Sequence, residues 1–395
     1  MNVVYLDNNA TTGVAPEVLE AIRPFLTERY GNPSSMHSFG GSVARDVTRA
    51  RAELAELLGA TPQEIVFTSG GTESDSTAIL SALATMPERR EIVTTRVEHP
   101  AVLNLCKHLA RDKGYTVHWL SVDREGLLDM EEVRSKISDR TAVVSVMWAN
   151  NETGVIFPVE EIADIARDHG ALMHTDAVQA VGKIPINLGS SNINFLALSG
   201  HKLHAVKGIG ALYVKKGTRF SPFIIGGHQE SDRRGGTENV PGIVALGEAA
   251  RLAAQNLEAE NSRVRRLRDR LEAGLLSTIS ASRVNGSTRF RLSNTTNIGF
   301  EFVEGEAILM RMDDKGICAS SGSACTSGSL EPSHVLRAMG VPFTAVHGSI
   351  RFSLSRYNTD QEIQYVIDQL PGIIAFLRSL SPFGRENLAA ACIVH

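Results

Sequence analysis

Lys202 is the residue of this chain whose setting first suggests chemistry. It ends the stretch of residues 198–202, Leu-Ser-Gly-His-Lys, which is made mostly of small and apolar residues and is not a charged surface run. A lysine that is partly buried has a lowered pKa, and its neutral amine can form a Schiff base. Most lysines are solvated surface residues, so the residues that accompany Lys202 must decide between the two interpretations.

An aspartate and a histidine follow other apolar runs. Asp176 comes directly after residues 171–175, at the end of a predicted strand. A carboxylate buried at such a position is costly without a cationic partner. A protonated pyridine nitrogen would be such a partner, and a ring kept cationic withdraws electrons from a carbanion, as pyridoxal chemistry requires. A helix cap or a loop hydrogen bond is the commoner role of such an aspartate. His99 can lie on a cofactor ring or move protons near neutral pH, although a lone histidine is more often structural.

The turn Gly70-Gly71-Thr72 lies between a predicted strand and a predicted helix. Free backbone N–H groups and the helix dipole at such a turn suit a phosphate group. Thr72, with Asp75 three residues later, can equally be a helix N-cap. For this turn alone, both interpretations stay open.

The four cysteines are Cys106, Cys318, Cys325 and Cys392, and they lack the C-x-x-C pairing of zinc or redox sites. Reduced thiols are therefore expected. Cys325 lies in a Ser/Gly-rich loop over residues 320–329, where small neighbours make the backbone flexible. Ten extended residues span roughly 30 Å, enough to carry a thiol from a pocket to the surface. Cys318 is the competing nucleophile, but it follows a probable strand start, which favours packing.

The elements that must position these residues follow from the hydrophobic pattern. Between about residues 64 and 216, short β-branched runs alternate with polar turns and helical stretches such as 159–169, the rhythm of a parallel α/β sheet. The expected strands cover residues 64–68, 91–95, 142–147, 171–174, 195–198 and 210–214. Ligands bind beyond the carboxyl ends of such strands, so we expect the polar residues found there to meet at one edge.

The rest of the chain predicts a second, smaller unit. A long helix over about residues 241–277 leaves the first unit, strands follow at 297–302 and 349–354, and a final helix begins near residue 359. We expect a large cofactor-binding domain over residues 12–255. Residues 1–11 and 256–395 would form a small domain that carries the cysteine loop, 320–332.

Bulk composition excludes several classes of protein. The 395 residues are 43% hydrophobic and 21% charged, with a formal net charge of −4. Such a chain is neither disordered nor basic enough to suggest a nucleic-acid partner. The first residues lack the basic region of a signal peptide, and the apolar runs are too short to span a bilayer. We therefore expect a cytoplasmic protein without a membrane partner.

Together, these motifs resemble the class V aminotransferase family of fold-type I pyridoxal-phosphate enzymes, and specifically the cysteine desulfurases. The resemblance covers nearly the whole chain and is carried by residues 5–12, 31–35, 71–74, 97–100, 150–154, 174–179, 200–202 and 234–239. It implies an α/β fold with a mostly parallel seven-stranded sheet in the large domain and an α+β small domain. It also implies pyridoxal 5'-phosphate as the cofactor.

The resemblance assigns a role to each candidate residue. Lys202 would carry the cofactor, Asp176 would pair with the ring nitrogen, and Gln179 would bond the ring phenolate oxygen. His99 would stack on the ring, and the catalytic residues would be Lys202, His99 and Cys325. The further cofactor-binding positions are Gly71, Thr72, Asn151, Ser199, Gly200, His201 and, reaching the phosphate of the neighbouring subunit of a homodimer, Thr237. Asn151 and Arg351 match the groups that bind the substrate carboxylate, a task that suits a planar guanidinium.

Residues 321–332 resemble the long catalytic loop of the group I desulfurases, which serve iron–sulfur cluster assembly. This implies conversion of L-cysteine to L-alanine, with the sulfur held as a persulfide on Cys325 and passed to an iron–sulfur scaffold protein. Residues 147–153 and 322–329 look closest to the nitrogen-fixation type, which supplies nitrogenase clusters. No metal ligands are expected, apart from Cys325 as a transient ligand of a cluster.

Three alternatives stay open from the sequence. The chain could be a housekeeping desulfurase of the same group. It could be another pyridoxal-phosphate enzyme, such as an aminotransferase or a selenocysteine lyase, that shares the Lys202 site without the persulfide step. It could also be an assembly scaffold that keeps the cofactor for stability.

Overall fold

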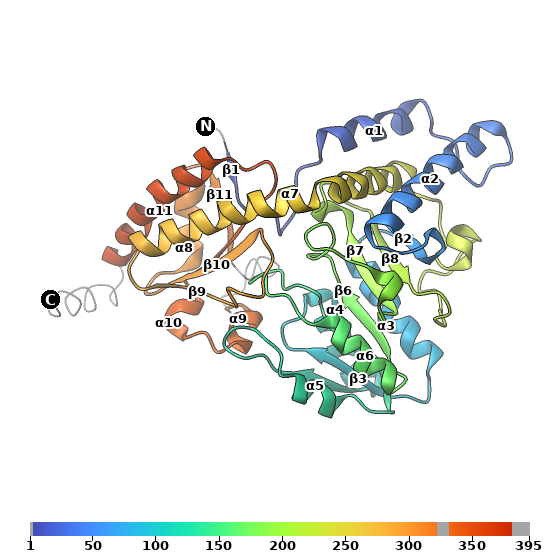
Figure 1. The fold of residues 1–395 in the computed structure, drawn as a ribbon, viewed down its shortest axis with the longest axis horizontal. Coiled ribbons are helices and arrows are strands. Elements are labelled where there is room, and N and C mark those ends of the chain that lie inside the picture. Colours follow the sequence, from blue (N-terminus) through green and yellow to red (C-terminus); the bar gives the residue numbers. More distant parts are fainter. Residues whose placement is uncertain (1–2, 322–331, 381–395) are drawn as a thin grey trace.

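A seven-stranded sheet organises the larger part of the chain in the computed structural model, which describes residues 3–321 and 332–380 (Figure 1). Its strands, in the order β2-β8-β7-β6-β5-β3-β4, are β2 (Ile65–Thr68), β8 (Gly210–Val214), β7 (Phe195–Ser199), β6 (Leu172–Asp176), β5 (Thr141–Ser145), β3 (Glu91–Thr95) and β4 (Thr116–Leu120). All neighbours from β7 to β4 pair in parallel, whereas β8 is antiparallel to both β7 and β2. The carboxyl ends of every strand except β8 therefore point to one edge, and the predicted mostly parallel seven-stranded sheet is confirmed.

Helices cover both faces of this sheet, which explains why its central strands are apolar on both sides. On one face, α3 (Gly71–Thr85) and α4 (Pro100–Lys113) share a core with strand residues. The other face packs against α6 (Val159–Asp168) and α7 (Val240–Thr278), with α1 (Pro16–Thr27) and α2 (Ser38–Leu57) alongside α7. The short helix α5 (Met130–Lys136) lies beside β4.

Strand β4 is the one strand of this sheet that the sequence patterns did not predict. Its residues Thr-Val-His-Trp-Leu alternate in polarity, and most remain partly exposed because β4 is at the edge of the sheet. The other strands of this sheet differ from the prediction only by small shifts of their ends. Strand β6 extends to Asp176 and β7 to Ser199, so each of these two predicted site residues is the last of its strand.

The smaller part is built around an antiparallel sheet in the order β12-β13-β10-β9. Its strands are β9 (Ser282–Val284), β10 (Thr295–Phe300), β12 (Ser320–Ser321) and β13 (Ser349–Ser353), and β1 (Val4–Tyr5) pairs in parallel with β11 (Ile317–Cys318). Its helices are α8 (Gly305–Asp313), α9 (His334–Ala338), α10 (Phe343–Val346) and α11 (Asp360–Leu380). A separate apolar core lies here, with Leu6, Phe300 and Phe352 fully buried.

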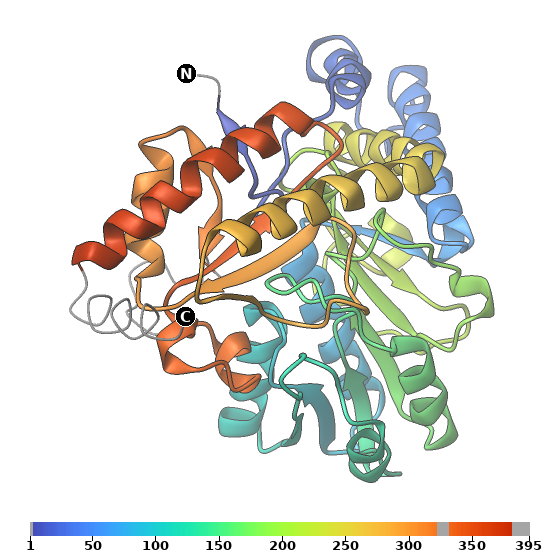
Figure 2. The same ribbon diagram turned by 60° about the vertical axis from the view of Figure 1, so that its left-hand side comes forward.

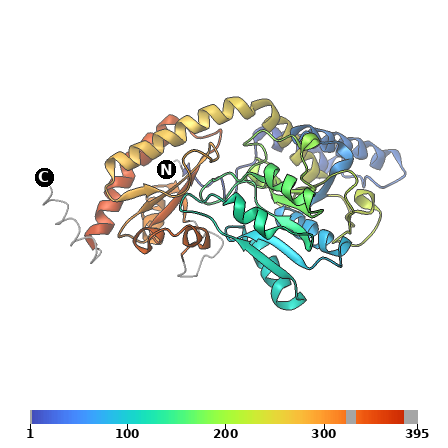
Figure 3. The same ribbon diagram turned by 60° about the horizontal axis from the view of Figure 1, so that its bottom comes forward.

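Helix α7 joins the two cores. Its first half packs into the larger core through residues such as Leu246, and its second half packs into the smaller core through residues such as Leu271. Figures 2 and 3 show this long helix running from one part of the molecule to the other. The division predicted between residues 255 and 256 falls inside α7 and stays a prediction. Within the described ranges, no helix is both long and apolar enough to cross a membrane.

The contact between α2 and α7 depends on a glycine. A Cβ at Gly247 would lie 2.5 Å from the Cα of Ala50, whereas a Cβ at Gly372, which is exposed on α11, would meet nothing within 4 Å. We expect Gly247→Ala to lower the free energy of unfolding by about 1–3 kcal/mol, because the two helices must separate. Gly372→Ala should raise it by up to about 1 kcal/mol, since alanine favours a helix. Urea denaturation of both variants checks this, and equal effects would contradict it.

Candidate active site

The N-terminal segment 7–12 lies against Lys202 at the carboxyl edge of the large sheet. Lys202 ends a short 3-10 helix (Gly200–Lys202) directly after β7. Its Nζ donates to the carbonyl oxygens of Asn9 and Ala10 at 2.5 and 2.6 Å. The hydroxyl of Thr12 donates to the carbonyl of His201 at 2.9 Å, which ties the same segment to the 3-10 helix. Lys202 is therefore a partly buried amine held at the strand ends, as predicted, and not a surface lysine.

Asp176 is a buried carboxylate close to two basic groups. One of its oxygens accepts from the backbone N–H of Val178 at 2.9 Å, the loop hydrogen bond that an aspartate at a turn commonly makes. Burial raises the pKa of Asp176, and the neighbouring His99 and Lys202 act in the opposite direction. A cation at this edge of the sheet would therefore favour the ionised form of Asp176.

His99 has a structural role as well as a place at this edge. Its Nδ1 accepts from the N–H of Ala101 at 3.2 Å, which caps helix α4 and leaves Nε2 as the protonated nitrogen of the neutral ring. Burial lowers the pKa of His99, although Asp176 opposes this. The neutral, flat ring is suited to packing on a cofactor ring.

Two further carboxyl groups and a histidine lie buried around Asp176. Burial raises the pKa of Glu98 to about 8 and that of Asp75 well above its ordinary value, with Asp176 adding to both shifts. Burial also lowers the pKa of His174, whose Nε2 is 3.4 Å from Asp75 Oδ1, to about 3. All three groups are therefore favoured in their neutral forms. Among these carboxyl groups, Asp176 is the one whose pKa is lowered by neighbouring basic groups, His99 and Lys202.

The turn at the start of α3 is the predicted cradle for the phosphate group. Gly70 precedes the helix, and the first backbone N–H groups of a helix have no partner within it. A Cβ at Gly70 would have only the Ser199 hydroxyl within 4 Å, at 3.9 Å, whereas a Cβ at Gly71 would lie 2.8 Å from the side chain of Val178. Thr72 is exposed in the first helical turn. The residue that precedes the helix is Gly70, so Thr72 is not the N-cap. Phosphate binding at this turn stays a prediction.

Ser199, a predicted phosphate ligand, lies at this turn, because a Cβ at Gly71 would be 3.7 Å from its side chain. Ser199 ends β7 and is buried, and Gly200 follows it. The neighbouring His201 bonds through Nδ1 to the hydroxyl of Thr11 at 3.1 Å. Burial, together with Lys202 and other lysines, lowers the pKa of His201 to about 4, so its neutral ring can act as a donor without adding charge.

Asn9 connects the predicted cofactor and substrate positions. Its carbonyl accepts from Gln179 Nε2 at 3.0 Å as well as from Lys202, and its own Nδ2 donates to the carbonyl of Asn151 at 3.1 Å. The carbonyl of Asn151 also accepts from Arg351 Nη1 at 3.0 Å. A chain of hydrogen bonds thus runs from Gln179 through Asn9 to Arg351.

Arg351 is buried and only partly satisfied. Its Nη2 pairs with Asp7 at 2.7 Å, with side chains 3% and 18% exposed, respectively. Within the part of the chain that the structure describes, its buried Nε has no hydrogen-bond partner. An unpaired buried donor is costly, and a small carboxylate bound here would satisfy it.

One predicted residue among those described, Thr237, is not part of this cluster. Thr237 is exposed and lies three residues beyond Arg234, which pairs with Glu73 of α3 at 2.9 Å. Cys325, with the possible cluster-ligand role assigned to it, lies outside the described residues, as does Cys392. The chain on either side of residues 322–331 is nevertheless anchored at the site, because Ser320 of β12 pairs with Arg351 and the hydroxyl of Ser333 donates to Glu152.

Both competing thiols have raised pKa values. Cys106 belongs to α4 and is fully buried in the core, and burial raises its pKa to about 12. Cys318 is partly exposed in β11, and burial raises its pKa, with Asp313 and Asp7 adding to the shift. Both thiols are therefore poorer thiolates than an ordinary cysteine.

Sequence reasoning missed the groups that support this site. Asp7 and Asn9 stood in a segment that carried the family resemblance, but no role followed from it. Asp75 lies inside a helical pattern and His174 inside an apolar one, and that mismatch was the signal that could have identified them. Glu98 lies in the turn after β3, directly before the predicted His99.

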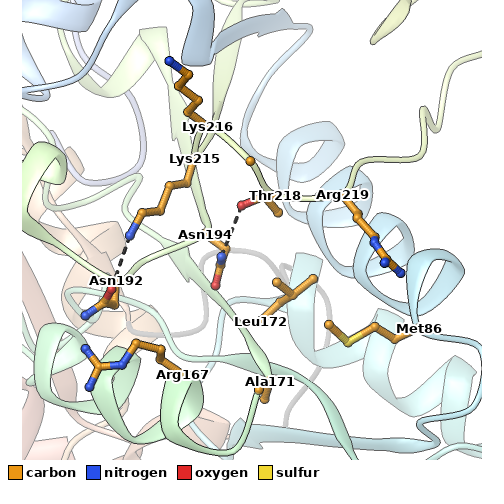
Figure 4. Close-up of a pocket in the computed structure, with 12 residues that line it drawn as sticks. Met86, Arg167, Ala171, Leu172, Asn192, Asn194, Lys215, Lys216, Thr218 and Arg219 are labelled. Carbon is orange, nitrogen blue, oxygen red and sulfur yellow. Dashed lines mark hydrogen bonds between the residues drawn. The ribbon is translucent and has the colours of Figure 1, made fainter.

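A surface pocket of about 440 Å³ opens at the opposite edge of the sheet (Figure 4). It is lined by residues at the start of β6 and the end of β8, including Leu172, Lys215 and Arg219. None of the predicted site residues lines it. This pocket is therefore separate from the candidate active site.

Pyridoxal phosphate fits the residues present. Its phosphate would lie at the start of α3 by Gly71, Thr72, Ser199, Gly200 and His201, and its ring nitrogen would face Asp176. The buried carboxylate beside His99 and the open space at Gly70 are the features of this structure that such a group would fill.

Glu152, next to Asn151, gives a test of the electrostatics at this edge. Burial raises the pKa of Glu152 from 4.5 to about 7. Between these pH values the unfolded chain loses a proton that the folded chain keeps, so this residue lowers stability as the pH rises. Glu152→Gln cannot ionise, so between pH 4.5 and 8 it should gain up to about 3 kcal/mol relative to the parent protein.

Urea denaturation of the holoenzyme at several pH values measures this difference. Glu161→Gln, at a carboxylate that is 49% exposed, is the matched control and should follow the parent profile. Parallel profiles for Glu152→Gln and the parent protein would contradict the assignment.

Comparisons with known proteins agree with this geometry. The family model described as "Aminotransferase class-V" matches residues 4–366. A cysteine desulfurase of Gluconacetobacter diazotrophicus is 62% identical over 99% of this chain and 98% of its own length. The cysteine desulfurase NifS of Azotobacter vinelandii is 59% identical over 97% of this chain and 96% of its own length.

A solved structure described as a NifS-like protein matches the fold with a TM-score of 0.89 and 37% identity, over 95% of this chain and all of the other. The resemblance predicted from the motifs is thus confirmed. This chain belongs to the class V aminotransferase family and, within it, to the cysteine desulfurases.

Proposed function

We propose that this protein is a pyridoxal-phosphate-dependent cysteine desulfurase of the nitrogen-fixation type, which converts L-cysteine to L-alanine and holds the sulfur as a persulfide on Cys325. The observation that carries the proposal is the position of Lys202 at the carboxyl edge of the sheet, close to Asp176, His99 and Gln179. The names of the relatives, one of them NifS, support the same activity.

Each side chain of the cluster has a task in this reaction. When bound, pyridoxal phosphate draws away the electron pair that is left when the substrate loses its Cα proton. Lys202 holds the cofactor at rest and, once displaced by the substrate amine, its Nζ takes up the Cα proton and later returns it. Asp176 would keep a proton on the ring nitrogen, and His99 would pack on the ring.

The substrate carboxylate is bound by Arg351 and Asn151. The unpaired Nε of Arg351 and its fixed place beside Asn151 support this role. Binding there orients the substrate so that its Cα faces Lys202 and its sulfur is open to attack.

Sulfur transfer is assigned to Cys325. Its thiolate attacks the substrate sulfur, an S–S bond forms, and the C–S bond breaks with its electron pair remaining on the substrate carbon. That carbon then takes up a proton and leaves as alanine. Atoms balance, because one cysteine and one Cys325 thiol give one alanine and one Cys325 persulfide.

A homodimer belongs to the proposal. Thr237 is exposed, so it is available to the cofactor phosphate of a neighbouring subunit. Large apolar side chains are also exposed around α1, α2 and residues 223–225, with Tyr30 at 72% and Ile225 at 85%. The sulfur acceptor is proposed to be an iron–sulfur scaffold protein, and the compartment the cytoplasm.

Two substitutions separate the two halves of the reaction. Cys325→Ser should abolish sulfide and alanine production while the visible absorption of the bound cofactor stays intact. Lys202→Ala should remove the absorption band that depends on the lysine linkage. Mass spectrometry of the parent enzyme after cysteine treatment should find added sulfur on the peptide that contains Cys325.

Cys318→Ser is the matched control, and it should retain activity. Unchanged turnover in Cys325→Ser, or added sulfur on Cys318, would overturn the choice of nucleophile. A retained lysine-linked band in Lys202→Ala would overturn the cofactor assignment.

Arg351→Lys tests the substrate site. Lysine keeps the charge but loses the planar fork, so KM for cysteine should rise about 10- to 100-fold. Arg283→Lys, in an exposed pair with Glu301, is the control and should leave KM unchanged. An unchanged KM in Arg351→Lys would rule out this role for Arg351.

A further inference from the structure

A second lysine, Lys183, lies beside Lys202 and has no role in the reaction as proposed above. It comes four residues after Gln179, and its Nζ donates to Gln179 Oε1 at 2.9 Å. Lys183 and Lys202 line the same cavity, whose volume of about 40 Å³ holds roughly one water molecule. The two amines thus approach the same small space between the two parts of the chain.

The charges around Lys183 are mainly positive. Among the described residues, no carboxylate forms an ion pair with Lys183, and Glu260, which lines the same cavity, pairs with Arg356 at 2.8 Å. Burial lowers the pKa of Lys183 to about 7, and the charges of Lys202 and Arg351 contribute to the shift. An amine in such surroundings is stabilised by an anion, or by a polar group that transmits its charge to one.

The side-chain amide of Gln179 is fixed from both ends. The carbonyl of Asn9 can only accept, so it must face the amide nitrogen, Nε2, at 3.0 Å. Lys183 donates to the other end, the amide oxygen Oε1. The Asn9 carbonyl also accepts from Lys202, so Nε2 is the end of Gln179 that lies on the Lys202 side. Without Lys183, the amide oxygen would lose its donor and the amide could rotate.

We propose that Lys183 is a positioning residue that acts through Gln179. It holds the amide so that Nε2 faces the anionic ring oxygen of the cofactor, and it thereby lowers the proton affinity of the nitrogen that joins Lys202 to the cofactor. The proposal rests on the role proposed above for Gln179. A donor to the ring oxygen stabilises the form in which that oxygen carries its full charge, which is the form without the proton on nitrogen.

The test is a pH titration of the visible absorption band of the holoenzyme. Lys183→Met removes the donor and its charge but keeps the length of the side chain. It should raise the titration midpoint by about one pH unit, a tenfold gain in proton affinity. Lys183→Arg keeps a charged donor and should stay close to the parent midpoint. An unchanged midpoint in Lys183→Met would overturn the proposal.

Lys215→Met is the matched control. Like Lys183, Lys215 is a partly buried lysine. Its Nζ donates to the carbonyl oxygen of Ser191 at 2.7 Å, and it lines the pocket at the opposite edge of the sheet, which Figure 4 draws. Its replacement should not move the midpoint. If Lys183→Met does not fold, Lys183→Ala is titrated instead, with and without methylammonium. Methylammonium can occupy the space left by the lysine side chain and donate to Gln179, so it should restore the parent midpoint.

A double substitution shows whether Lys183 acts through Gln179. In a Gln179→Leu background, Lys183→Met should add less than about 0.3 pH units, because the group that it positions is gone. A full shift in that background would overturn the positioning role. A parent enzyme without any titrating visible band would instead contradict the proposed cofactor linkage, so the two failures are distinguishable.

Discussion

The site depends on how the chain keeps charged groups partly buried at one edge of a parallel sheet. An ionised group away from water is stable only with partners. Here carbonyl oxygens of the N-terminal segment bind Lys202, Asp7 pairs with Arg351, and the carboxyl groups near Asp176 are held neutral by burial. The charges left for chemistry are those that face a cofactor and a substrate.

This arrangement assigns different tasks to the two parts of the chain. The larger sheet supplies the groups that the proposed function assigns to the cofactor, because the carboxyl ends of β2, β3, β6 and β7 share one edge. The smaller part supplies Arg351 from the middle of β13. Asn9 links the two parts, since it bonds to Lys202, Asn151 and Thr295 of β10. The distance between cofactor and substrate groups is therefore set by hydrogen bonds and not by a flexible connection.

Much of this could be predicted from the sequence. The period of the apolar runs placed Asp176 and Lys202 at strand ends, and parallel strands bring such ends together whatever lies between them. The pairing of Asp7 with Arg351 and of Asn9 with Gln179 could not be predicted, because these residues are more than 150 positions apart and leave no local pattern. Lys183 was missed for a related reason: a lysine in a turn resembles a surface residue until the groups that surround it are known.

The place of the N-terminal segment also bears on how the protein is made. Strand β1 pairs with β11, and Asn9 bonds to Ser353, so residues made first find their partners among residues made more than 300 positions later. Contacts between residues this distant in sequence form late, after most of the chain has been synthesised. While the ribosome is still extending the chain, the large sheet can form, but the N-terminal segment that covers Lys202 lacks its partners in β11 and β13. Stable cofactor capture is therefore expected only after β13 has been made.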